Sequence, residues 1–210
     1  MLQSRIRYLL SGSCLFFFIS CTPVYRQMQA TTGHISGLAK FKPAFSVTLY
    51  HAQVDVVGNH LGGLLLIKKM QDSSTRMVFS NEMGFKFFDF EFSPGGNFKV
   101  YSVVKQMNKK AVLKTLRKDF ELILMDNLDS ASLSVRAGNG LKYYIFPQAK
   151  GYNYYITDST GDKLVRMERA SKRKTVVEAI MSDYKNGIPD TIGISHKTFN
   201  FTIGLKRIER

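Results

Sequence analysis

The chain contains few of the residues that define several classes of protein. Its 210 residues include no tryptophan, five prolines, two cysteines and four histidines. Two cysteines cannot form the disulfide framework of a small secreted domain or a four-cysteine zinc site. The histidines are scattered along the sequence, so we expect no metal centre. These scarcities favour a domain that is held together by an ordinary hydrophobic core.

The amino-terminal stretch of the chain is mostly apolar. Arg5 and Arg7 precede an apolar core at residues 15–19. This core is too short for a permanent membrane-spanning helix, and it ends at the small residue Ser20, as a secretory signal peptide does. We therefore expect residues 1–20 to be a lipoprotein signal peptide that is removed.

The end of this leader carries a cysteine at the expected cleavage site. The sequence Phe18-Ile19-Ser20-Cys21 resembles a bacterial lipobox, with Phe18 in place of the usual leucine. In such signals the cysteine becomes the new amino terminus and carries acyl chains that tether the protein to a membrane. The alternative is an ordinary signal peptide with a cysteine at its cleavage site. Thr22 follows in place of the aspartate that retains lipoproteins in the inner membrane, which favours the periplasmic face of the outer membrane.

Acidic residues are scarce relative to basic ones. The chain has 16 Asp and Glu against 30 Lys and Arg, a formal net charge of +14. Basic residues gather in two segments, and those expected to form a patch are Lys114, Arg117, Lys118, Arg166, Arg169, Lys172, Arg173 and Lys174. Such a patch fits anionic lipid or an acidic partner, or it is simply a solvated surface. Behind a secretion signal we expect no nucleic-acid partner.

After a polar segment at 21–40, expected to be the acylated cysteine and a linker, the sequence predicts one mainly β domain over residues 41–210. Apolar and polar residues alternate in short runs that are separated by turn residues, the pattern of antiparallel strands. We expect strands near residues 45–50, 61–69, 76–79, 87–92, 98–105, 133–136, 141–146, 152–157, 164–168, 176–184, 191–195 and 199–208.

The periodicity changes to that of a helix over residues 109–125, with Asn108 expected as its cap. So many antiparallel strands must curve, or their edges would lie open. The expected fold is therefore a curved antiparallel sheet or incomplete β-barrel of about eleven strands, lidded by one central helix. Such a lid encloses an apolar space that can hold an acyl chain. The candidate cavity residues are Phe88, Phe90, Phe92, Leu113, Leu116 and Phe120. The alternative is that these side chains simply fill the core.

The order of these elements resembles the LolA/LolB lipoprotein-localisation superfamily. The similar stretches are residues 61–68, 76–84, 87–90 with the following helix, and the hairpin at 183–194, within a resemblance that covers roughly residues 45–208. The resemblance implies an incomplete barrel lidded by helices, with an apolar cavity for the acyl chains of lipoproteins. LolB is itself an outer-membrane lipoprotein that accepts lipoproteins from the soluble carrier LolA. A LolB-like protein would therefore have lipoproteins and a LolA-like periplasmic carrier as partners.

Motifs that would indicate catalysis are missing from the sequence. It contains no HExxH, GxSxG, Walker or GxGxxG motif in a suitable context. Asp89 and Glu91 form a carboxylate pair, which we expect on the solvated outer face of a strand. We therefore expect neither an enzyme nor a bound cofactor. Two hypotheses remain: an outer-membrane-anchored lipoprotein that binds acyl chains and receives lipoproteins, or a non-catalytic structural or interaction lipoprotein of the envelope with a filled core.

Overall fold

The computed structural model describes residues 25, 28–126, 128–171 and 174–209. The expected leader and Cys21 lie outside the described residues. In chain order the elements are β1 (Gln29–Ala30), α1 (Ser36–Ala39), β2 (Val47–Val56), β3 (Asn59–Lys69), β4 (Thr75–Ser80), β5 (Lys86–Phe92), β6 (Phe98–Val103), α2 (Lys110–Leu124), η2 (Ser130–Ser132), β7 (Ser134–Gly138), β8 (Leu141–Pro147), β9 (Tyr152–Asp158), β10 (Leu164–Ala170), β11 (Thr175–Ser182), β12 (Thr191–His196) and β13 (Phe201–Arg207).

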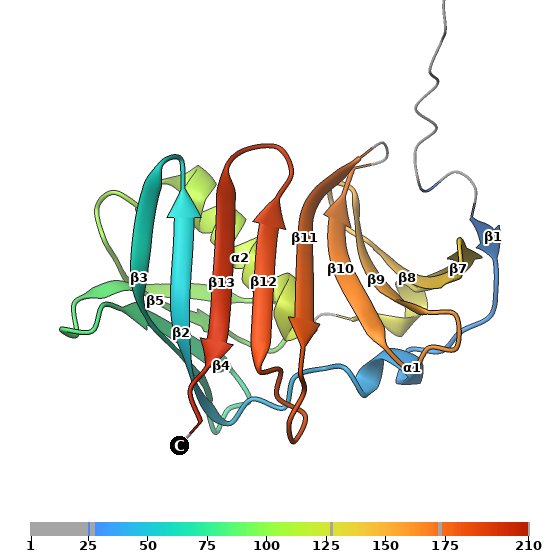
Figure 1. Ribbon diagram of the computed structural model, residues 1–210, viewed down its shortest axis with the longest axis horizontal. Helices are drawn as coiled ribbons and strands as arrows, with labels where there is room; N and C mark the ends of the chain where they lie inside the picture. Colours follow the sequence, from blue (N-terminus) through green and yellow to red (C-terminus); the bar gives the residue numbers. More distant parts are fainter. Residues whose placement is uncertain (1–24, 26–27, 127, 172–173, 210) are drawn as a thin grey trace, which may run out of the picture.

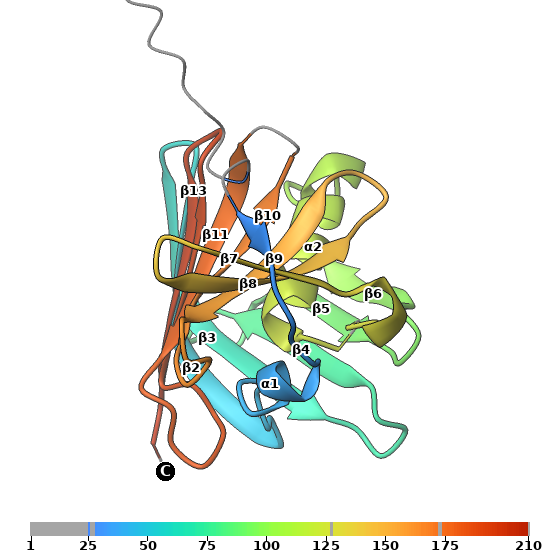
Figure 2. The same cartoon turned by 90° about the vertical axis from the view of Figure 1, so that its right-hand side faces the viewer.

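The strands form one antiparallel sheet in the order β1-β7-β8-β9-β10-β11-β12-β13-β2-β3-β4-β5-β6 (Figure 1). β1 and β6 are its two edges, and they do not pair with each other, so the sheet curves without closing. Figure 2 shows the sheet bending around α2, with β11 and β13 on one side and β5 and β6 on the other. This architecture confirms the predicted mainly β fold with a curved, open sheet and one central helix. The described sheet has thirteen strands, against the expected eleven or so.

The periodicities of the strands and of α2 place large apolar side chains in one shared core. Tyr50 of β2, Met77 of β4 and Phe90 of β5 are fully buried. Leu116 and Phe120 of α2 belong to the same cluster, because α2 joins β6 to β7 across the concave face. Burial of each such side chain contributes about 1.5–3 kcal/mol relative to exposure. The alternating and helical patterns therefore fix which face of each element turns inward.

The ends of α2 differ slightly from those expected. The residue before the helix is Lys109, in an extended conformation and without a capping side-chain hydrogen bond, so the prediction that Asn108 is the cap is wrong. Asn108 lies one residue before the capping position, and its backbone N–H donates to the carbonyl of Val104. No helix in the described part of the chain has the length and apolar character needed to cross a membrane.

The segment expected as a linker packs on the domain along much of its length. β1 pairs with β7, and Leu38 of α1 is fully buried. On the outer face of the sheet, the Tyr25 ring stacks on Tyr154 with centroids 4.4 Å apart, and its hydroxyl bonds to Glu168 and Thr175. The sequence allowed one weak helical turn in this segment, which α1 provides, but a two-residue strand has no readable periodicity, so β1 was not predicted.

Asp89 is buried rather than solvated. Arg76 donates to both of its oxygens, from Nε at 2.8 Å and from Nη2 at 3.0 Å, and Lys86 lies 3.5 Å away. The Arg76 guanidinium in turn covers the ring of Tyr101, at 3.9 Å from the centroid. The hydrogen bonds from Arg76 hold the pKa of the Asp89 carboxyl below its usual range. The expected solvated position is therefore wrong, because cationic neighbours on adjacent positions cover this carboxylate.

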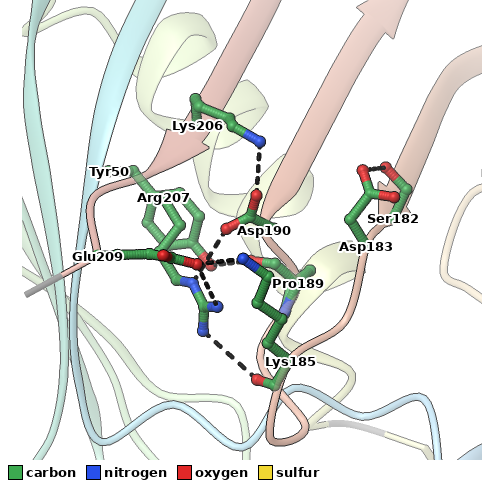
Figure 3. Close-up of polar contacts among 9 residues, drawn as sticks. All are labelled: Tyr50, Ser182, Asp183, Lys185, Pro189, Asp190, Lys206, Arg207 and Glu209. Carbon is green, nitrogen blue, oxygen red and sulfur yellow. Dashed lines mark hydrogen bonds and ion pairs between the residues drawn. The ribbon is translucent and has the colours of Figure 1, made fainter.

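A second polar network ties the C-terminal strand to the loop before β12 (Figure 3). Asp190 accepts hydrogen bonds from Lys206 and from Arg207 Nε, the latter at 3.2 Å. Beside it, the buried Tyr50 hydroxyl donates to the carbonyl of Pro189 at 2.7 Å. The network joins β2, β13 and the β11–β12 connection, so it fixes one end of the curved sheet.

Candidate functional site

A cavity of about 840 Å³ lies between α2 and the concave face of the sheet. Its wall is almost entirely apolar and comes from elements that are distant in the sequence. The main contributors are Ala52, Val54 and Val56 of β2, Leu61 and Leu65 of β3, Ile203 and Leu205 of β13, and Leu116 and Phe120 of α2. Pockets of this size and polarity are typical of sites for small apolar ligands.

Three of the six predicted cavity residues line this space, namely Phe88, Leu116 and Phe120. Phe90 instead stacks against the ring of Phe88 at 4.3 Å. Phe92 packs edge-on against the ring of Phe120, at 6.2 Å.

Leu113 is partly buried against the same core without lining the cavity. The aromatic stripe of β5 therefore divides between the two roles that the sequence left open. Phe88 forms part of the cavity wall, and Phe90 and Phe92 fill the core beside it.

The opposite wall of the cavity was missed by sequence reasoning. It consists of inward-facing residues of β2 and β13, which pair from Phe201 opposite Val56 to Arg207 opposite Tyr50. The alternation of Val54 and Val56 with polar residues was a usable local signal. The pairing of these two strands, which come from opposite ends of the domain, could not be predicted, since local periodicity carries no information on strand order.

The cavity opens where its lining residues become exposed, and we call this opening the cavity mouth. Val57, Phe85 and Phe199 line the cavity and remain 71%, 58% and 45% exposed. Met83, on the same loop as Phe85, is 92% exposed. Three loops thus present large apolar side chains to solvent around one opening, a feature that marks contact surfaces for apolar partners.

The predicted basic patch does not form one surface. Lys114, Arg117 and Lys118 lie on α2, and Arg169 is close to them, since burial followed by the charges of Arg169 and Lys114 lowers the pKa of Lys118. Arg166 binds Glu168 within its own strand. Residues an odd number apart on a strand face opposite sides, so Arg166 and Arg169 are separated by the sheet.

Of the remaining members of the predicted patch, Lys174 is exposed just before β11, whereas Lys172 and Arg173 lie outside the described residues.

A buried charged cluster fastens α2 to the sheet beside the cavity. Asp119 of α2 has no exposed surface; Arg169 Nη2 lies 3.0 Å from its Oδ1 and His196 Nε2 lies 2.8 Å from its Oδ2. The His196 ring also contacts the rings of Phe199 and Phe201, which line the cavity. In the described part of the chain, no group of three or more His, Cys, Asp or Glu is placed to hold a metal.

Comparison with known proteins finds similarity in structure alone. No family model matches the chain, and no curated protein matches it in sequence. Among solved structures, a LolA superfamily protein from Nitrosomonas europaea is 7% identical, with a TM-score of 0.49 over 85% of this chain and 93% of that one.

Two further structures are similar over most of their length. A DUF1329 family protein from Desulfovibrio piger is 11% identical, with a TM-score of 0.44 over 85% of this chain and 92% of its own. A Vibrio parahaemolyticus domain, assigned provisionally to an outer membrane lipoprotein-sorting protein, is 5% identical, with a TM-score of 0.46 over 84% and 90%.

Proposed function

We propose that this protein is a lipid-anchored protein of the cell envelope that binds acyl chains in the cavity beneath α2. The observation that carries the proposal is the cavity itself, about 840 Å³ of apolar-walled space that opens at one mouth. Each methylene group moved from water into such a space contributes about 0.8 kcal/mol. An acyl chain therefore gains enough from burial here to be held without any covalent step.

The cavity mouth suits transfer from one apolar environment to another. Val57, Phe85 and Phe199 would contact a bilayer or the open cavity of a donor, so that a chain passes across without crossing water. Binding and release need no nucleophile, proton transfer or cofactor. The protein would act by differential affinity for the chain, which makes it a binding protein and not an enzyme.

We further propose that acylated Cys21 holds the domain at the periplasmic face of the outer membrane, where it receives lipoproteins from a LolA-like carrier. The resemblance of residues 45–208 to the LolA/LolB superfamily supports this cargo. Tyr25, four residues after Cys21, already lies on the sheet. Four extended residues reach at most about 14 Å, so this anchor would hold the outer face of β9 close to the bilayer.

Native mass spectrometry of the purified protein tests acyl-chain binding. We expect a co-purified lipid or fatty acid in the wild type and its loss in Val54→Asp, which places a carboxylate in the cavity wall. Gln53→Asp is the matched control, because Gln53 is the adjacent, exposed residue on the other face of β2.

Both variants should keep the circular dichroism spectrum of the wild type. A wild type that stays free of ligand after incubation with lipid and acylated peptide would contradict the proposal. That result would favour the alternative of a non-catalytic interaction lipoprotein of the envelope.

A further inference from the structure

We propose that this cavity also accepts a phospholipid with an anionic headgroup, held with its phosphate group at Lys109. The inference rests on the proposed function, because it specifies which acyl lipid occupies the same site. Two properties of the cavity lead to it: its apolar wall takes the acyl chains, and the charge at its mouth selects the headgroup.

The cavity has room for lipid tails. Its volume of about 840 Å³ is in the range of pockets that bury most of the surface of a small ligand. Its wall is almost entirely apolar, so the acyl chains of a lipid would lie inside while the polar headgroup stays at the mouth.

The charge that lines the cavity is of one sign, and the exposed Glu82, on the loop of Met83 and Phe85, does not line it. Among the described residues that line the cavity, Lys109 is the sole charged side chain and none is acidic. It is exposed, it is flanked by the exposed Lys105 and Lys110, and the amide of Gln106 lines the cavity beside it.

The surroundings of Lys109 on the other elements reinforce this charge. The first turn of α2 contains no acidic residue, so the positive end of the helix dipole at Lys109 is not neutralised. On β2, Asp55 faces the outer side of the sheet and binds His60 at 2.7 Å. A phosphate group at the mouth would therefore meet a cation, whereas the ammonium of a zwitterionic headgroup would find no carboxylate among the lining residues.

The test is competition between headgroups on the full-length protein, extracted in mild detergent and offered equimolar dimyristoyl phosphatidylglycerol and phosphatidylethanolamine. Native mass spectrometry should show one lipid per protein, with phosphatidylglycerol preferred about fivefold, the effect expected of one lysine near a lipid headgroup. Lys109→Gln should bring the two lipids to near parity while total occupancy persists. Lys150→Gln, an exposed lysine in the β8–β9 turn, should leave the preference unchanged.

The outcomes separate this inference from the proposed function. Equal occupancy by the two headgroups, or a preference that survives Lys109→Gln, would overturn the headgroup assignment and leave acyl binding intact. Binding of a triacylated lipopeptide without binding of either phospholipid would overturn this inference and leave the proposed function standing. Absence of all lipid would refute both.

Discussion

Val57 has a backbone conformation that β-branched residues avoid. With Gly58 it forms the turn between β2 and β3, at φ angles of 45° and 80°. Asn-Gly is the favoured pair in two-residue turns of this kind, and a β-branched residue there costs about 1–3 kcal/mol. The Val57 side chain is 71% exposed, so packing within the described fold does not offset this strain. A strained apolar residue at the cavity mouth is expected where contact with an apolar partner matters more than stability.

Val57→Asn should therefore stabilise the protein and impair its function. We expect a gain of about 1 kcal/mol in the free energy of unfolding, together with slower uptake of lipid from vesicles because the mouth loses an apolar contact. Denaturant titration and a fluorescent-lipid transfer assay measure the two effects. Asn139 already occupies the left-handed position of the β7–β8 turn, with φ 53°.

The reverse substitution there, Asn139→Val, serves as the control. It should lower stability without changing lipid uptake. Uptake by Val57→Asn at the wild-type rate would mean that the apolar side chain of Val57 has no role at the mouth.

At the scale of elements, α2 is held to the sheet by charge as well as by apolar packing. The Asp119 carboxylate contacts Arg169 of β10 and His196 of β12, and the three side chains form one buried cluster. Asp119→Asn keeps the shape of the side chain but removes the negative charge, leaving Arg169 uncompensated. We expect a loss of about 3 kcal/mol in the free energy of unfolding, measured by denaturant titration.

Asp126→Asn is the matched control for Asp119→Asn. Asp126 pairs with Lys42 at 2.7 Å in a half-exposed position just after α2. Its loss should cost less than about 1 kcal/mol. Equal effects at the two positions would show that the buried cluster does not hold the helix.

Local periodicity predicted most elements but little of their arrangement. The helix was expected at 109–125 and spans Lys110–Leu124, and the 176–184 segment is strand β11 (Thr175–Ser182) in spite of its helical propensity. The strand order was not predictable, because the pairing of β13 with β2 depends on contacts across the whole domain.

The candidate site shows the same limit. Phe88, Leu116 and Phe120 were found because each lies in a strongly patterned element. The wall on β2 and β13 required knowledge of the pairing. The burial of Asp89 required knowledge of Arg76 on the neighbouring strand.

At the scale of the whole molecule, an open sheet has no closing strand pair, so side-chain networks help to hold its parts together. Asp89 joins β5 to Arg76 of β4, and Asp190 joins the loop before β12 to Lys206 and Arg207 of β13. Hydrogen bonds from these cations, led by Arg76 and by Lys206 respectively, lower the pKa of both carboxyls. Each carboxylate is thus more acidic in the folded than in the unfolded chain, so each stabilises the fold in its ionised form.

The sign of the resulting pH dependence follows from this difference. An aspartate in the unfolded chain titrates near pH 3.9, so the stabilisation from Asp89 and Asp190 is complete above that pH and is lost as the pH falls through their lower folded values. Acid also adds positive charge to a chain that already carries +14, and the added repulsion acts in the same direction. We expect the melting temperature to fall steeply below about pH 4.

The double variant Asp89→Asn, Asp190→Asn should be less stable at pH 7 but should lose less stability between pH 5 and pH 3, since the repulsion remains while the two carboxylates are gone. Parallel curves for the two proteins would assign the acid sensitivity to general repulsion, and added salt would then restore the melting temperature of both alike.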